Sequence, residues 1–95
     1  MSINNFEIPI LFLVFNRPEL TLKVFNKIKE IKPNKLYVAC DGPRNLKNEK
    51  QIVNQVREIT NNINWDCKLN KLFRNQNLGC KNAVSGALDW FFDNE

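Results

Sequence analysis

The sequence has no histidine, and this absence excludes more chemistry than any other feature of its composition. A chain without histidine cannot form a Ser-His-Asp or Cys-His catalytic arrangement, nor a histidine metal site. Acid–base chemistry would instead need carboxylates, Lys81 or Tyr37. The cysteines are odd in number and lack CxxC spacing, which argues against a disulfide framework or a zinc site: Cys40, Cys67 and Cys80. We expect buried thiols in a reducing compartment.

Two phosphate-binding fingerprints are also missing. The chain has three glycines, and neither GxGxxG nor GxxxxGK(S/T) occurs, which argues against dinucleotide binding and P-loop chemistry. The apolar run from Ile8 to Phe15 is far shorter than the roughly 20 residues of a transmembrane helix. The first residues lack the basic start and small-residue cleavage site of a signal peptide. We therefore expect a cytoplasmic protein, or one at the cytoplasmic face of something membrane-associated.

Length and charge limit the possibilities further. The 95 residues make one domain at most, and a small one. The net charge is +4, but the basic residues are scattered and do not alternate with a cluster of aromatic residues. This pattern favours a solvated surface over a nucleic-acid interface, so no nucleic-acid partner is expected.

The clearest structural signal is the apolar run from Ile8 to Phe15, which leads directly into a polar turn. Such a run predicts a strand buried on both faces, in a parallel sheet with helices on each side. Asn16 as N-cap, Pro18 in the first turn and Glu19 in a capping-box-like position predict that a helix follows. The apolar positions of this helix recur every three or four residues, and the sequence Lys-Pro-Asn at 32–34 ends it: Leu20, Val24, Ile28 and Ile31.

The same alternation continues along the chain. Residues 36–40 predict a second strand, 46–62 a helix, 67–74 a third strand and 80–93 a third helix. The last two helices have apolar stripes at helical spacing: Ile52, Val56, Ile59 and Ile63 in one, and Val84, Ala87, Leu88 and Phe91 in the other. This βαβαβα order predicts an α/β fold, a three-layer parallel sheet with right-handed crossovers and strand order 3-2-1. It corresponds to half of a nucleotide-binding domain.

Polar residues follow each predicted strand, where an α/β sheet places its ligand sites. A carboxylate there can bind ribose or a base N–H group, an arginine can stack on a base or pair with phosphate, and a helix N-terminus can receive an anion. Each residue also has a structural explanation, as a helix cap, a turn residue or a solvated side chain. The candidate nucleotide-binding residues are Asn16, Arg17, Asp41, Gly42, Arg44, Asn75, Asn77, Gly79 and Lys81.

Three segments in combination resemble a known family: ILFLVFNRPE, YVACDGPR and FRNQNLGCKNAVSGALDWFF. They resemble the start of a GT-A-type nucleotide-sugar glycosyltransferase. More narrowly, the chain is similar to bacterial sugar transferases related to the N-acetylglucosaminyltransferase I group and to family-2-like transferases. The resemblance extends from about residue 8 to residue 95.

The resemblance implies a UDP-sugar donor. Arg17 would lie against its uracil–ribose portion, Asp41 would bind the base, and the turn at 75–81 would approach ribose or diphosphate. The full-length enzyme would use a divalent metal, Mn or Mg, held by an acidic motif after a further strand. No such motif occurs before residue 95, and Asp93 and Glu95 are poor substitutes at a helix end. We therefore expect a truncated nucleotide-binding half-domain, 1–95, without a metal, catalytic residues or activity of its own.

A second hypothesis comes from a different class of protein, a non-catalytic assembly module. In GT-A sheets the first strand is central, and the strand that would cover its far side is not present in this sequence. The run from Ile8 to Phe15 would then be an open edge, and exposed apolar edges pair with other chains. This predicts a homodimer through that edge or through exchanged helices.

Overall fold

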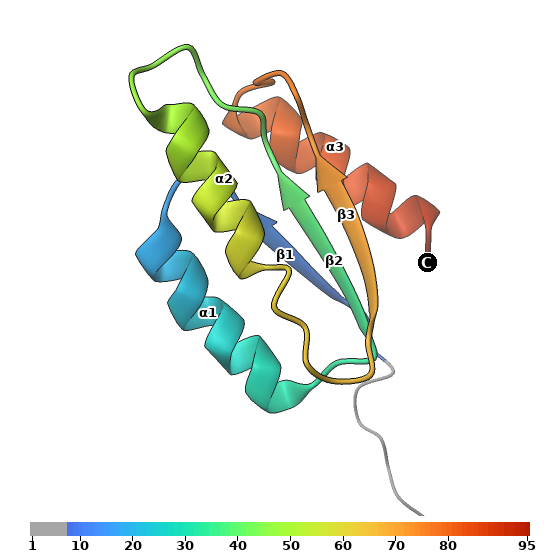
Figure 1. Ribbon diagram of the computed structural model, residues 1–95. Helices are drawn as coiled ribbons and strands as arrows, with labels where there is room; N and C mark the ends of the chain where they lie inside the picture. Colours follow the sequence, from blue (N-terminus) through green and yellow to red (C-terminus); the bar gives the residue numbers. More distant parts are fainter. Residues whose placement is uncertain (1–7) are drawn as a thin grey trace, which may run out of the picture.

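The structure is a computed structural model, and it describes residues 8–95. Strands and helices alternate along the whole of this part (Figure 1). The six elements are β1 (Ile10–Val14), α1 (Pro18–Ile31), β2 (Lys35–Cys40), α2 (Glu49–Ile59), β3 (Lys68–Phe73) and α3 (Cys80–Asp93).

The strands form one parallel sheet in the order β1-β2-β3, so β2 lies in the middle. Ile10 pairs with Leu36 at the start of β1, and Lys35 pairs with Lys68 at the start of β3. In Figure 1, α1 and α2 lie on one side of the sheet and α3 on the other. The prediction of an α/β fold with three parallel strands and three helices is confirmed. Its assignment to the GT-A type stays a prediction.

The core lies between the sheet and the α1–α2 layer, where α2 buries Val53 and Val56 completely and a cluster forms around α1. Its buried members are each 8% exposed or less: Phe12, Phe25, Ile28, Leu36 and Val38. Burial of one such side chain contributes about 1.5–3 kcal/mol, so this cluster is a main source of stability. On the other face of the sheet, the ring of Tyr37 makes edge contacts with Trp90 and Phe91 of α3, with centroid distances of 5.2 and 4.9 Å.

The prediction that the first strand is buried on both faces is wrong. β1 is shorter than the apolar run, and it lies at an edge of the sheet. Ile8 is 71% exposed and Leu13 is 42% exposed. The buried strand is β2, in which every residue after Lys35 is buried. Position in the sheet, and not the apolar content of the strand, decides which strand is covered.

The apolar stripe predicted for α1 is also wrong in part. The helix buries Thr21, Phe25 and Ile28. Leu20, Val24 and Ile31 are exposed instead, by 52%, 38% and 40%. The buried set and the exposed set are two neighbouring stripes of α1, and both have helical spacing. The stripe that contains the large ring of Phe25 is the one that packs against the sheet.

The helix ends also differ from the predictions. The N-cap of α1 is Arg17, which makes no side-chain cap hydrogen bond, and the predicted cap Asn16 donates to Glu49 instead. α2 is shorter than predicted, since residues 46–48 form a turn in which Asn48 has φ +66°. α3 has the predicted bounds, but of its predicted stripe only Ala87 is fully buried, and Leu88 is 40% exposed.

The two tryptophans lie in different layers. Trp65 packs against Phe25 of α1, with centroids 6.2 Å apart, and its indole N–H donates to the carbonyl of Pro33 at 2.7 Å. Trp90 belongs to α3 and contacts Tyr37 on the opposite face of the sheet. Within residues 8–95, no helix combines the length and the apolar character that a membrane crossing requires.

Candidate functional site

A pocket of about 420 Å³ lies at the carboxyl ends of β1 and β2, beside the start of α3. Six of the nine candidate residues line it: Asn16, Arg17, Asp41, Arg44, Asn77 and Gly79. Gly42, Asn75 and Lys81 do not contribute to its lining; Asn75 lies at a separate shallow hollow, and Lys81 is exposed. The apolar part of the wall comes from both strands and from α3: Leu13, Val14, Phe15, Ala39, Ala83 and Val84.

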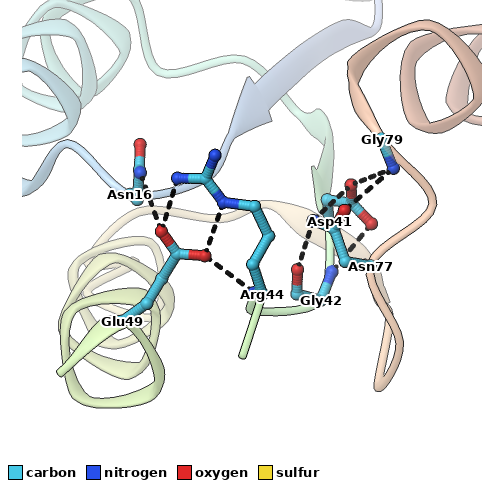
Figure 2. Close-up of polar contacts among 7 residues, drawn as sticks. All are labelled: Asn16, Asp41, Gly42, Arg44, Glu49, Asn77 and Gly79. Atoms are coloured by element: carbon cyan, nitrogen blue, oxygen red, sulfur yellow. Dashed lines mark hydrogen bonds and ion pairs between the residues drawn. The ribbon is translucent and has the colours of Figure 1, made fainter. Parts of the chain in front are cut away.

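The buried carboxylate of Asp41 organises one wall of the pocket. One oxygen accepts from the backbone N–H groups of Gly42 at 2.8 Å and Leu78 at 2.9 Å. The other accepts from the Asn77 amide and the Gly79 N–H, both at 3.1 Å (Figure 2). Asp41 therefore joins the end of β2 to the turn that precedes α3. The amides of Leu78 and Gly79, which we expected to be available to an anion at this helix start, already bind a carboxylate.

Two glycines allow this wall to form. A Cβ on Gly42 would lie 2.4 Å from the backbone carbonyl carbon of Gln76, so no larger residue fits between the two turns. Gly79 has φ +86°, a conformation that residues with a Cβ rarely adopt. The sequence motif Asp-Gly at 41–42 is thus explained by close packing of one turn on another.

Glu49 organises the opposite wall, and the sequence did not identify it as a site residue. It is 5% exposed and accepts from Arg44 three times: from the backbone N–H at 2.7 Å, from Nε at 2.9 Å and from Nη2 at 2.7 Å. The Asn16 amide also donates to it, at 3.3 Å. The hydrogen bonds from Arg44 lower the pKa of Glu49 from 4.5 to about 2. The sequence does contain a signal for the burial of Glu49. It lies four residues before Val53, which places both side chains on the buried side of α2.

Arg44 is held in place from a second direction. Its guanidinium carbon lies 5.6 Å from the centre of the Phe15 ring, within the range of a cation–π contact. Half of its side chain remains exposed. Arg44 therefore closes one side of the pocket, with its charge balanced by Glu49.

Two further arginines, which the sequence did not single out, meet near the end of β3: Arg57 of α2 and Arg74, the residue after β3. Arg57 donates to the carbonyls of Asp41 at 3.1 Å and Arg74 at 2.7 Å, and it stacks on Phe73, so it joins the ends of β2 and β3. Arg74 lines the pocket and is half-buried. Its Nη2 lies 2.7 Å from where a Cβ would stand on Gly86 of α3.

The cysteines differ in their surroundings. Cys40 is buried at the pocket, and burial raises the pKa of its thiol. Cys67 is half-buried. Cys80 lines the pocket and is exposed, so the prediction of three buried thiols is wrong for this residue. Its position as the first residue of α3, before the helix packs on the sheet, accounts for the exposure.

The pocket does not fit a divalent metal. Both oxygens of Asp41 and both oxygens of Glu49 already accept hydrogen bonds from the chain, so neither carboxylate offers a free oxygen. In the part of the chain from residue 8 onward, no group of three or more His, Cys, Asp or Glu side chains could hold a metal ion. Glu95 binds Lys35 and Tyr37 at the start of β2, at the other end of the sheet from the pocket.

The fold and the site define a class of architecture: an α/β protein with a pocket at the carboxyl edge of a parallel sheet. Ligands bind at this edge in open α/β sheets. Comparison of the chain with protein-family models, with curated proteins and with solved structures finds no match.

Proposed function

We propose that the pocket binds the nucleoside part of a nucleotide. The observation that carries the proposal is the position of the pocket: polar residues after β1, β2 and β3 meet there, at the edge where α/β sheets bind ligands. Its volume of about 420 Å³ is in the range of small-molecule sites.

The lining has the two properties that a nucleoside requires. The apolar side chains of β1, β2 and α3 provide a surface for a flat base. Arg17 is exposed at the rim, and within residues 8–95 its guanidinium makes no hydrogen bond or ion pair, so it is available to a ligand. Its planar group can stack on a base or bind an anion. Asp41 serves this site by positioning the turn before α3, because its oxygens are occupied.

We further propose that the protein acts in sugar transfer from a UDP-sugar to a hydroxyl acceptor. The support is the resemblance of the three segments to GT-A-type transferases, together with a pocket where those segments meet. Displacement at the anomeric carbon would need a base and a leaving-group stabiliser. The pocket residues supply neither a free carboxylate nor a histidine, so this chain would contribute donor binding.

Calorimetric titration of the chain with uridine and UDP tests the proposed binding. The Arg17→Ala variant should bind UDP about tenfold more weakly, which corresponds to one lost contact of about 1.4 kcal/mol. Lys81→Ala is the matched control, because it also removes a positive charge near the start of α3 but outside the pocket lining. If the chain binds neither uridine nor UDP, the proposal is contradicted. It is also contradicted if Arg17→Ala and Lys81→Ala lose the same affinity for UDP.

A second candidate function, a homodimer through the β1 edge, rests on a specific contrast between the two outer strands. β3 carries Lys68 and Lys71, charges of the kind that discourage pairing at an edge. β1 carries no charge, and α1, the helix that follows it, exposes Leu20 and Val24. We propose that this apolar edge and stripe associate with a second copy of the chain.

Sedimentation of the chain at high micromolar concentration tests this second candidate. Val24→Lys should shift a dimer toward monomer, because Val24 lies on the exposed stripe. Leu46→Lys is the control, since Leu46 is 55% exposed in the turn before α2 and outside that stripe. A monomer at every concentration would refute the homodimer.

A further inference from the structure

We infer that the pocket binds a phosphate-type anion directly through arginine, with Arg74 as the principal ligand and without a bridging metal. The inference rests on the proposed function for its choice of site. It adds the chemistry of the charged part of the ligand, and it assigns a role to Arg74 and Gly86, two residues outside the candidate set.

The first step concerns the start of α3, where a diphosphate was expected. The carboxylate of Asp41 occupies this position and accepts from Leu78 N–H and Gly79 N–H at 2.9 and 3.1 Å. A second anion next to it would be repelled by the Asp41 charge and would lack these two donors. Repulsion by the Asp41 charge therefore favours a position for the anionic part of a ligand away from Asp41, nearer the arginines of the pocket.

The second step concerns the balance of charge around the pocket. The Glu49 charge is neutralised by Arg44 through paired hydrogen bonds of 2.9 and 2.7 Å. The other charged lining residues are Asp41, whose carboxylate is bound by neutral donors, and two arginines, Arg17 at the rim and Arg74 at the end of β3. Arginine forms forked hydrogen bonds with phosphate oxygens, whereas a divalent metal prefers carboxylate oxygens, and both carboxylates here already accept hydrogen bonds.

The third step concerns how Arg74 is held. A glycine inside a helix costs about 1 kcal/mol relative to alanine, so Gly86 in the middle of α3 needs a structural reason. Arg74 offers one, because its Nη2 lies 2.7 Å from where a Cβ would stand and would have to move if residue 86 had a side chain. Within residues 8–95 the Arg74 guanidinium forms no hydrogen bond or ion pair, although the residue is half-buried. A half-buried guanidinium beside this notch, without a bonded partner in the described part of the chain, can bind an anion in the pocket.

The experiment uses pyrophosphate, uridine and UDP as probes, each titrated calorimetrically into the chain in EDTA and again with Mg²⁺. We expect pyrophosphate to bind in EDTA, and Arg74→Gln to weaken it about tenfold, as the loss of one charge-assisted contact implies. Gly86→Ala should also weaken binding, because the new Cβ displaces Arg74, while thermal stability stays equal or rises. Ser85→Ala, at the exposed neighbouring position of α3, should change neither quantity.

The outcomes separate this inference from the proposed function. Pyrophosphate binding that requires Mg²⁺, or that is unchanged in Arg74→Gln, overturns the inference. Uridine binding without pyrophosphate binding overturns it too and leaves the nucleoside proposal standing. Pyrophosphate binding that depends on Arg74, with no contribution from uridine, supports the inference and overturns the nucleoside proposal. Absence of binding by all three probes overturns both.

Discussion

The two walls of the pocket are built around two buried carboxylates that work in opposite ways. Asp41 gathers neutral donors, three backbone N–H groups and one side-chain amide. All but the neighbouring Gly42 N–H come from a turn that lies 36–38 residues away in the sequence. Glu49 gathers a charged donor, Arg44, from only five residues away, with Asn16 added (Figure 2). The Asp41 wall connects distant parts of the fold, and the Glu49 wall is largely local.

This difference predicts different responses to perturbation. Breaking the Asp41 wall leaves the buried N–H group of Gly42 and the part-buried N–H groups of Leu78 and Gly79 without acceptors, and a buried group in this state costs about 1–3 kcal/mol. The Glu49 wall depends on an ion pair in which half of the Arg44 side chain is in contact with solvent, so salt and pH should affect it. Four experiments test this contrast.

The largest effect is expected from Gly42→Ala, which breaks the Asp41 wall at its backbone. The added methyl group would meet three backbone atoms of Gln76 at 2.4–2.7 Å, and neither turn can move without losing the Asp41 bonds. We expect a loss of about 3 kcal/mol in the free energy of unfolding, measured by urea denaturation. Gly86→Ala is the matched control, since its Cβ would meet only the end of the Arg74 side chain. An equal loss in both variants would contradict the assignment.

Asp41→Ala should have the next largest effect. It leaves the N–H groups of Gly42, Leu78 and Gly79 without their acceptor, and we expect a loss of about 2 kcal/mol. Amide hydrogen exchange should accelerate at Leu78 and Gly79. If exchange at these two amides is the same as in the unaltered chain, the described role of Asp41 is wrong.

Glu49→Gln should destabilise the chain less than Asp41→Ala. The amide keeps one acceptor for the Arg44 backbone N–H but loses the charge that pairs with the guanidinium. The stability of the unaltered chain should fall as NaCl is raised, and the variant should show less of this dependence. Asp41→Asn provides the comparison, because that wall uses neutral donors and its variant should retain the full salt dependence.

The smallest effect is expected from pH. The folded-state pKa of Glu49 is about 2, below its ordinary value of 4.5, so its contribution to stability is present above pH 4.5 and is lost as the pH falls toward 2. The hydrogen bond from Tyr37 also lowers the pKa of Glu95, which adds a change of the same sign. Urea midpoints between pH 7 and pH 2.5 should therefore fall, and less steeply for Glu49→Gln. Parallel profiles for the two proteins would contradict this reading of Glu49.

The sequence predicted the order and type of the elements, because apolar periodicity is a local property. It did not predict burial correctly for β1. The strand with the most continuous apolar run lies at the edge, and β2, with Tyr37 and Cys40, lies in the middle. Burial depends on which strands pair on each side, and that information is not contained in the strand itself.

The candidate site was predicted in its location but only partly in its residues. Asp41 and Arg17 follow strands directly, so the rule for sheet edges found them. Glu49, Arg57 and Arg74 were missed because their importance depends on contacts between separate elements. Asn16 shows the same effect, since its local sequence favours a helix cap whereas a carboxylate 33 residues away engages its side chain.

The placement of the two tryptophans has a consequence for measuring how this protein unfolds. Trp65 lies in the α1 layer beside Phe25, and Trp90 lies in the α3 layer beside Tyr37. Trp65→Phe and Trp90→Phe therefore give two single-tryptophan proteins whose fluorescence reports on opposite faces of one sheet. Coincident unfolding curves would indicate one cooperative unit, whereas separate curves would reveal α3 detaching while the α1 layer stays folded.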